Sequence, residues 1–194
     1  MAPLSILEMP LGQTQSSCAP AVWDAESWFS AEFAGERIVR FADLLYVLGG
    51  RPIHLAVELK ARGIEAAVWG ILSESPLRTT VTVTSSELEN LRRMREVSAE
   101  VRLGYLTRKV DESSLAAARS VGVVQLCPDA AGLDAEQIRF ARLEGLEVRC
   151  WNSLPSGAME NAAALGVDGM TVDFPGRLVE YLADRRLSRD HVTG

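Results

Sequence analysis

The chain has 194 residues, of which 47% are hydrophobic and 24% are charged, and its formal net charge is −6. These values are typical of a globular protein with a substantial core, and we expect a single domain over residues 1–194. There is no basic cluster, and no apolar run approaches the roughly 20 residues that span a bilayer. The sequence therefore argues against nucleic acid as a partner and against a membrane span.

The cysteines and the N-terminus predict the compartment. Cys18, Cys127 and Cys150 are odd in number and lack CxxC spacing, which is typical of a reducing environment. The N-terminus has neither the basic start nor the apolar stretch of a signal peptide. We therefore expect a cytoplasmic protein in which Cys127 and Cys150 are buried thiols.

Strand-like and helical runs alternate along the chain. The first strand is expected over Pro3–Met9, and the helical spacing of Phe41, Leu44, Leu45 and Leu48 precedes the next strand. From there the strands recur roughly every 20 to 25 residues, which is the length of one strand-plus-helix unit. These later predicted strands are Ile53–Lys60, Thr80–Thr84, Val101–Leu106, Val121–Cys127, Leu146–Trp151 and Gly169–Val172.

Capping patterns predict where helices begin between these strands. Ser86 with Glu89 forms a capping-box pattern, and Asp134 with Gln137 forms a looser one. A last helix is expected after Pro175.

Repeated strand–helix units close as an eight-stranded barrel or lie open as a doubly wound sheet. The doubly wound sheet usually carries a glycine-rich phosphate turn after an early strand, whereas here Gly49 and Gly50 precede a strand. The even period favours an α/β fold of the (β/α)8 TIM-barrel type, incomplete with about seven units. Its open edges could be covered in a homo-oligomer.

Two charges mark the end of the strand Ile53–Lys60. Glu58 and Lys60 are two residues apart, so strand alternation points both to one face. Such charges are costly on a buried strand unless they pair or do chemistry, and barrel chemistry lies at the C-terminal strand ends. His54 shares this face two pleats lower, and we expect it to be a core histidine. Four further residues fall at strand ends: Glu8, Ser85, Trp151 and Asp173.

Short motifs along the chain resemble, in order, those of the glycerophosphodiester phosphodiesterase family. Leu55–Lys60 is similar to the family's Glu-Ile-Lys strand, and Val83–Ser86 to the end of the following strand. Trp151 stands where the family has a tryptophan, and Gly166–Pro175 resembles its GVDG-x-x-TD-x-P ending. The resemblance implies a metal-dependent barrel of glycerol and lipid metabolism. This family hydrolyses glycerophosphodiesters to glycerol 3-phosphate and an alcohol.

The resemblance also implies residue roles. Glu8 and Glu58 would hold a divalent cation, Mg²⁺ or Ca²⁺, which neutralises the charge of a phosphodiester. Lys60 would be the catalytic residue that adds a point charge for the phosphate. Lys60, Ser85 and Trp151 would contact the small-molecule glycerophosphodiester.

The sequence departs from the family pattern at its start. The first-strand His-Arg-Gly motif is absent, and aligning Glu8 with the first metal-binding glutamate places Pro10 at a metal-binding aspartate and Trp23 at the second histidine. We therefore expect a truncated, degenerate member that lacks the first strand, binds its cation weakly and has impaired or lost activity. The alternative is a non-catalytic phosphate-ligand binding or interaction protein on the same scaffold.

Overall fold

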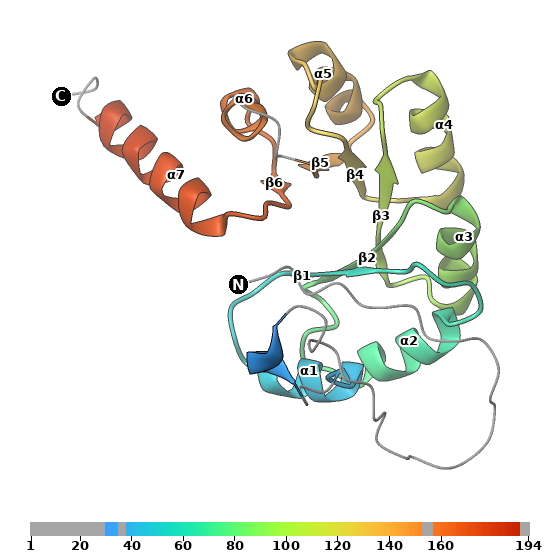
Figure 1. Cartoon of the computed structure of the whole chain (residues 1–194). Coiled ribbons are helices and arrows are strands. Elements are labelled where there is room, and N and C mark those ends of the chain that lie inside the picture. The colour runs from blue at the N-terminus through green and yellow to red at the C-terminus, as the bar shows by residue number, and fades with distance from the viewer. Residues whose placement is uncertain (1–29, 35–37, 153–156, 191–194) are drawn as a thin grey trace.

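A single parallel sheet organises the chain. The computed structural model describes residues 30–34, 38–152 and 157–190, with side chains described as far as residue 185. Six strands form one curled sheet in the order β1-β2-β3-β4-β5-β6, so each strand pairs with its neighbours in the sequence (Figure 1). The strands are β1 Leu55–Glu58, β2 Val81–Ser85, β3 Arg102–Thr107, β4 Gln125–Pro128, β5 Glu147–Cys150 and β6 Gly169–Met170.

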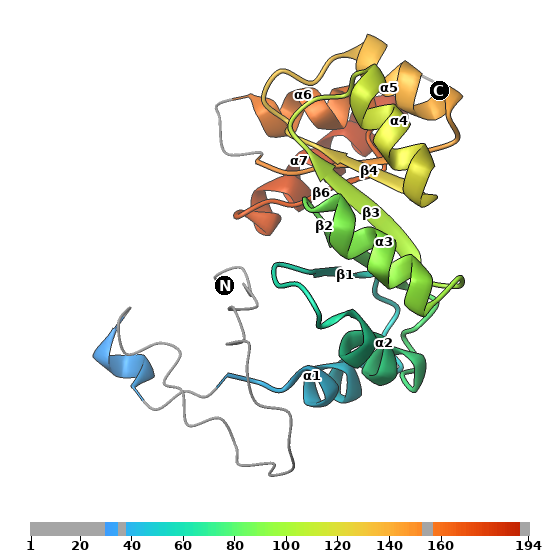
Figure 2. The same cartoon turned by 90° about the vertical axis from the view of Figure 1, so that its right-hand side faces the viewer.

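Helices follow the strands and line the outer side of the curl. Figures 1 and 2 show α1 to α6 around the convex side, while α7 extends away from the sheet. The helices are η1 Ala31–Phe33, α1 Phe41–Leu48, α2 Glu65–Ser73, α3 Leu88–Val97, α4 Glu112–Val121, α5 Ala135–Leu143, α6 Ala158–Leu165 and α7 Pro175–Asp190. In the part of the chain that the structure describes, no helix is both long and apolar enough to cross a bilayer.

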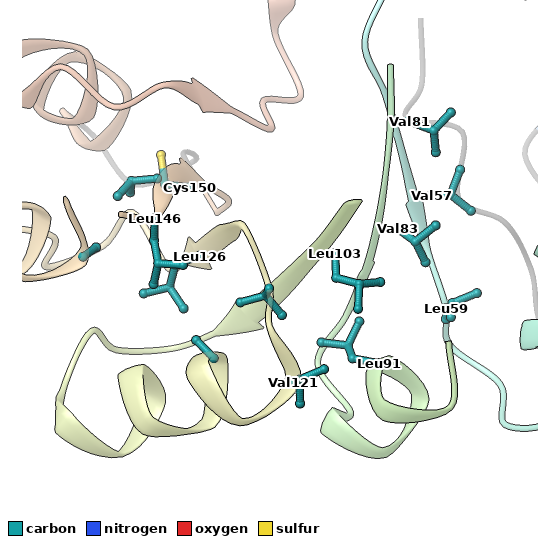
Figure 3. Packing of buried hydrophobic residues seen from close by; sticks show 14 of the residues in the cluster. Val57, Leu59, Val81, Val83, Leu91, Leu103, Val121, Leu126, Leu146 and Cys150 are labelled. Atoms are coloured by element: carbon teal, nitrogen blue, oxygen red, sulfur yellow. The ribbon is translucent and has the colours of Figure 1, made fainter. Parts of the chain in front are cut away.

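The hydrophobic core lies between the sheet and these helices. Every second strand residue points toward the helices, and Val83, Leu103 and Val148 are fully buried there. Figure 3 shows Leu91 of α3 and Val121 of α4 packed against this side of the sheet. Burial of large aliphatic side chains stabilises each by about 1.5–3 kcal/mol, so this layer holds the strands in register.

The opposite side of the sheet, which we call the inner face, carries the alternate residues. Parallel register aligns Glu58 with Thr84, Thr84 with Gly104, and Gln125 with Glu147. Register and alternation together define the inner face. Its strand residues are Ala56, Glu58, Thr82, Thr84, Arg102, Gly104, Leu106, Gln125, Cys127, Glu147, Arg149 and Gly169. Lys60 and Trp151 continue the same alternation just beyond the ends of β1 and β5.

Most predicted elements are confirmed, although β1, β4, β5 and β6 are shorter than predicted and β2 and β3 are shifted by one residue. The six strands expected after residue 50, the helix around Leu45 and the helix after Pro175 are all present. The capping box at Asp134 is confirmed, because Gln137 N donates to Asp134 Oδ1 at 2.8 Å and Asp134 N donates back to Gln137 Oε1 at 3.3 Å. The strand predicted over Pro3–Met9 lies outside the described residues.

Two local predictions are wrong. Val121 was expected in a strand but is the last residue of α4, because Gly122 caps that helix in the left-handed conformation. Ser86 was expected to cap α3, yet the cap position is Glu87 and its amide donates to the Ser85 hydroxyl at 3.1 Å. Ser85, and not Ser86, therefore supports the start of α3.

Candidate functional site

The C-terminal end of β1 presents an ion pair on the inner face. Lys60 Nζ lies 3.6 Å from Glu58 Oε2, and the two side chains are 49% and 42% exposed. The predicted shared orientation is thus confirmed. An ion pair with this much solvent around it contributes little to stability, so both charges can turn toward a ligand at small cost.

Leu59, between these charges, is firmly held. Its amide donates to Thr84 O at 2.8 Å. Its carbonyl accepts hydrogen bonds from Ser85 Oγ at 2.8 Å and from Asn90 Nδ2 at 3.3 Å. The side chain of Leu59 is buried in the core. The backbone that carries Glu58 and Lys60 is therefore fixed by β2 and by the first turns of α3.

Ser85 belongs to this support. It is 0% exposed, and its hydroxyl also accepts from Asn90 Nδ2 at 3.3 Å. It follows Thr84 on β2, so its side chain points away from the inner face. The described geometry gives it no surface for a ligand, and its contact with substrate stays a prediction.

Trp151 stands at the same edge on the far side of the sheet. Its indole Nε1 donates to Cys127 O at 3.0 Å and to Thr107 O at 3.2 Å. These acceptors lie at the C-terminal ends of β4 and β3, so the ring is fixed across that edge while part of it stays exposed. A fixed, partly exposed indole can serve as a wall for a glycerol or alcohol group.

The inner face also carries polar residues that sequence reasoning missed. Arg102 Nη2 lies 2.8 Å from Glu147 Oε1, and Gln125 Nε2 donates to Glu147 Oε2 at 3.1 Å. Arg149 follows on the same strand, with part of its surface exposed. The signal was present in the alternation of Glu147, Val148 and Arg149, where charges flank a core valine on a strand.

Three further residues singled out by the sequence are His54, Asp173 and Glu8. His54 was expected to be a core histidine, but its side chain is exposed. That prediction is wrong because the described elements leave the start of β1 uncovered on the inner face. Asp173 is exposed after β6. Glu8, the second predicted metal ligand, lies outside the described residues.

The described residues do not by themselves form a divalent-cation site. Across residues 30–34, 38–152 and 157–190, no three His, Cys, Asp or Glu side chains are grouped so that they could hold a metal ion. Glu58 instead faces the Lys60 ammonium. Mg²⁺ and Ca²⁺ prefer six or more oxygen ligands, which one carboxylate paired with a lysine does not supply.

Comparison with known proteins identifies related sequences. The model of the glycerophosphoryl diester phosphodiesterase family matches residues 53–177. A Bacillus subtilis homologue that carries the name of a glycerophosphodiester phosphodiesterase is 26% identical over 172 residues, covering 81% of this chain and 67% of that protein.

Solved structures of the same family share the fold. A glycerophosphoryl diester phosphodiesterase homologue from Silicibacter pomeroyi is 24% identical with a TM-score of 0.71, covering 78% of this chain and 58% of that one. An Oleispira antarctica phosphodiesterase in complex with the product sn-glycerol-3-phosphate is 18% identical with a TM-score of 0.73, covering 82% and 67%. The curled sheet is therefore an incomplete barrel of the predicted (β/α)8 type, and the chain spans about three fifths to two thirds of these relatives.

Proposed function

Because this chain belongs to the glycerophosphoryl diester phosphodiesterase family, we propose that it acts on glycerophosphodiesters at the C-terminal edge of the inner face. The products would be glycerol 3-phosphate and an alcohol. The observation that carries this proposal is the half-exposed Glu58–Lys60 pair at that edge, on the same face as Trp151. The complex of the Oleispira antarctica phosphodiesterase with sn-glycerol-3-phosphate supports the ligand class.

Each residue at this edge has a chemical task in the proposal. Lys60 supplies a mobile positive charge for the phosphate, and the half-exposed position lets its ammonium follow the ligand. Trp151 presents its fixed ring to the glycerol or alcohol carbons. The backbone of Leu59 keeps the two charges in place, because its carbonyl is held by Ser85 and Asn90.

Among the described residues, no histidine lies close to Lys60 to transfer protons. The histidine in the described part of the chain is His54, which lies at the opposite end of β1 from Lys60. Loss of a positioned general acid or base costs roughly 10²–10⁴-fold in rate. We therefore propose that hydrolysis by this chain is slow, with solvent taking over the proton transfers.

A divalent cation remains part of the proposal as a weakly bound group. A phosphate near Lys60 also meets the negative Glu58, and Mg²⁺ or Ca²⁺ would offset that repulsion when bound. Glu58 with Glu8 would be its ligands. Calorimetric titration with Mg²⁺ or Ca²⁺ tests this directly, and binding that is unchanged in Glu58→Gln would contradict a ligand role for Glu58.

Hydrolysis of glycerophosphocholine tests the main proposal. The purified chain is incubated with the substrate and Mg²⁺ or Ca²⁺, and glycerol 3-phosphate is measured against Glu58→Ala and Glu96→Ala variants. Glu96 is exposed on α3, on the outer side, so its loss should leave the rate unchanged. Slow release that disappears only in Glu58→Ala is expected. Release no greater than that of Glu58→Ala would reject catalysis.

Binding without turnover is the second candidate. It is favoured by the same shortage of acid–base groups, since a site with Lys60 and Trp151 can hold a phosphate ester without cleaving it. Saturable binding of glycerophosphocholine with no product over days would support this candidate. Metal-dependent hydrolysis of glycerophosphocholine would rule out this candidate function.

A further inference from the structure

Arg149 lies on the inner face, one layer below Trp151. It is in β5, two residues before Trp151, and therefore points to the same side. Its register partner in β6 is Gly169. Trp151 is at the C-terminal edge, so Arg149 lies closer to the middle of the sheet, where the floor of the candidate site would be.

The other cations of the inner face have carboxylate partners, but Arg149 has none among the described residues. Lys60 pairs with Glu58, and Arg102 pairs with Glu147. The nearby Cys127 thiol is uncharged at neutral pH, because burial raises its pKa to about 12. A partly buried guanidinium has five donors and is costly to leave without acceptors.

The sheet makes room for this side chain. A Cβ atom added at Gly169 would lie 3.3 Å from Cγ and 3.6 Å from Cδ of Arg149. The aliphatic part of the Arg149 side chain therefore packs over Gly169 of β6, which has no side chain of its own. At that register position β6 has a glycine and so offers the guanidinium no carboxylate.

Arg149 and Lys60 come from walls that face each other. β1 and β5 are four strands apart in a sheet that curls in the manner of an eight-stranded barrel (Figure 1). Four strands are half the circumference of such a barrel, and its interior is only about wide enough for side chains to fill. Long side chains from the two strands can therefore reach one small ligand between them.

We propose that Arg149 is a second cationic contact for the phosphate of the glycerophosphodiester, reaching it from the floor of the site while Lys60 reaches it from the mouth. The inference rests on the proposed function. An arginine fork binds two phosphate oxygens at once, which a lysine cannot do. The family resemblance in the sequence pointed to Trp151, at the end of β5, but not to Arg149. Arg149 adds a positive charge from the same strand.

Calorimetric titration with sn-glycerol 3-phosphate at low salt tests the inference. The proteins are wild type, Arg149→Gln, Arg149→Lys, Lys60→Met and, as a control for charge, Arg93→Gln on the outer helix α3. Loss of hydrogen bonds to a charged group predicts a dissociation constant about 10-fold higher or more for Arg149→Gln. Arg149→Lys should lie between Arg149→Gln and wild type, and Arg93→Gln should match wild type. Thermal melts check that each variant is folded.

The possible results separate this inference from the proposed function. If Lys60→Met binds weakly while Arg149→Gln and Arg149→Lys bind as tightly as wild type, the role of Arg149 is overturned and the proposed ligand class stands. If wild type itself does not bind, both are overturned. If Arg149→Gln fails to fold, Arg149→Lys decides alone, because it keeps the charge and removes only the fork.

Discussion

Removal of the Ser85 hydroxyl should destabilise the protein far more than removal of its neighbour. In Ser85→Ala the Leu59 carbonyl loses its 2.8 Å hydrogen bond, and the Glu87 amide loses its acceptor at 3.1 Å. Asn90 still reaches Leu59 O at 3.3 Å, so that carbonyl keeps one partner. The Glu87 amide at the start of α3 has no such substitute.

Asn90 Nδ2 also loses the Ser85 hydroxyl at 3.3 Å but keeps Leu59 O, so the two bonds above set the size of the effect. A neutral hydrogen bond contributes about 1 kcal/mol net, and leaving a buried donor unpaired costs a further 1–3 kcal/mol. Because Glu87 is partly hydrated, we expect about 2 kcal/mol for Ser85→Ala. In a protein of this size that corresponds to a fall in melting temperature of about 4–8 °C.

Ser86→Ala is the matched control. Ser86 is exposed, and a surface substitution of this kind usually changes the free energy of unfolding by less than about 0.5 kcal/mol. Urea and thermal unfolding followed by circular dichroism measure both variants. A loss in Ser86→Ala equal to or larger than that in Ser85→Ala would refute the assignment of the α3 start to Ser85.

Three further outcomes are expected. Gly104→Ala should cost about 1–3 kcal/mol, because the new Cβ would lie 2.9 Å from Thr84 Cγ2, and adding Thr84→Ser should recover part of this in chemical unfolding. Arg102→Met should lower the free energy of unfolding by less than about 1 kcal/mol, since its ion pair with Glu147 is partly exposed to solvent. A larger loss would show that this ion pair contributes more than a surface ion pair does. Burial raises the pKa of the Cys127 thiol to about 12 from 9.0, so this thiol loses its proton first in the unfolded chain. The free energy of unfolding should therefore fall between about pH 9 and pH 12, and it should fall less in Cys127→Ala; an equal fall in both proteins would contradict this source.

The regular elements were predictable because their signals are local. Each strand is a short apolar run, and each helix follows it at a regular interval, so the positions of β1 to β6 follow from the order of residues alone. The shared orientation of Glu58 and Lys60 needs only strand alternation, which the 3.6 Å ion pair confirms.

Features that depend on distant contacts were missed. The pattern of Ser86 and Glu89 looks like a helix start, but Ser85 is held by a carbonyl 26 residues away, which no local pattern reveals. Arg102 and Glu147 are 45 residues apart and meet only because of the register of β3, β4 and β5. His54 was misplaced for a related reason, since burial on the inner face depends on what covers it.

The indole signal of Trp151 in a ¹⁵N–¹H spectrum reports directly on the C-terminal edge of the inner face. We claim that this edge binds a phosphate ester. Addition of sn-glycerol 3-phosphate should move the Trp151 Nε1–H resonance, while that of Trp69 on α2, which packs against the core on the outer side, should stay in place. An unmoved Trp151 signal at saturating ligand, or a shift confined to Trp69, would contradict the claim.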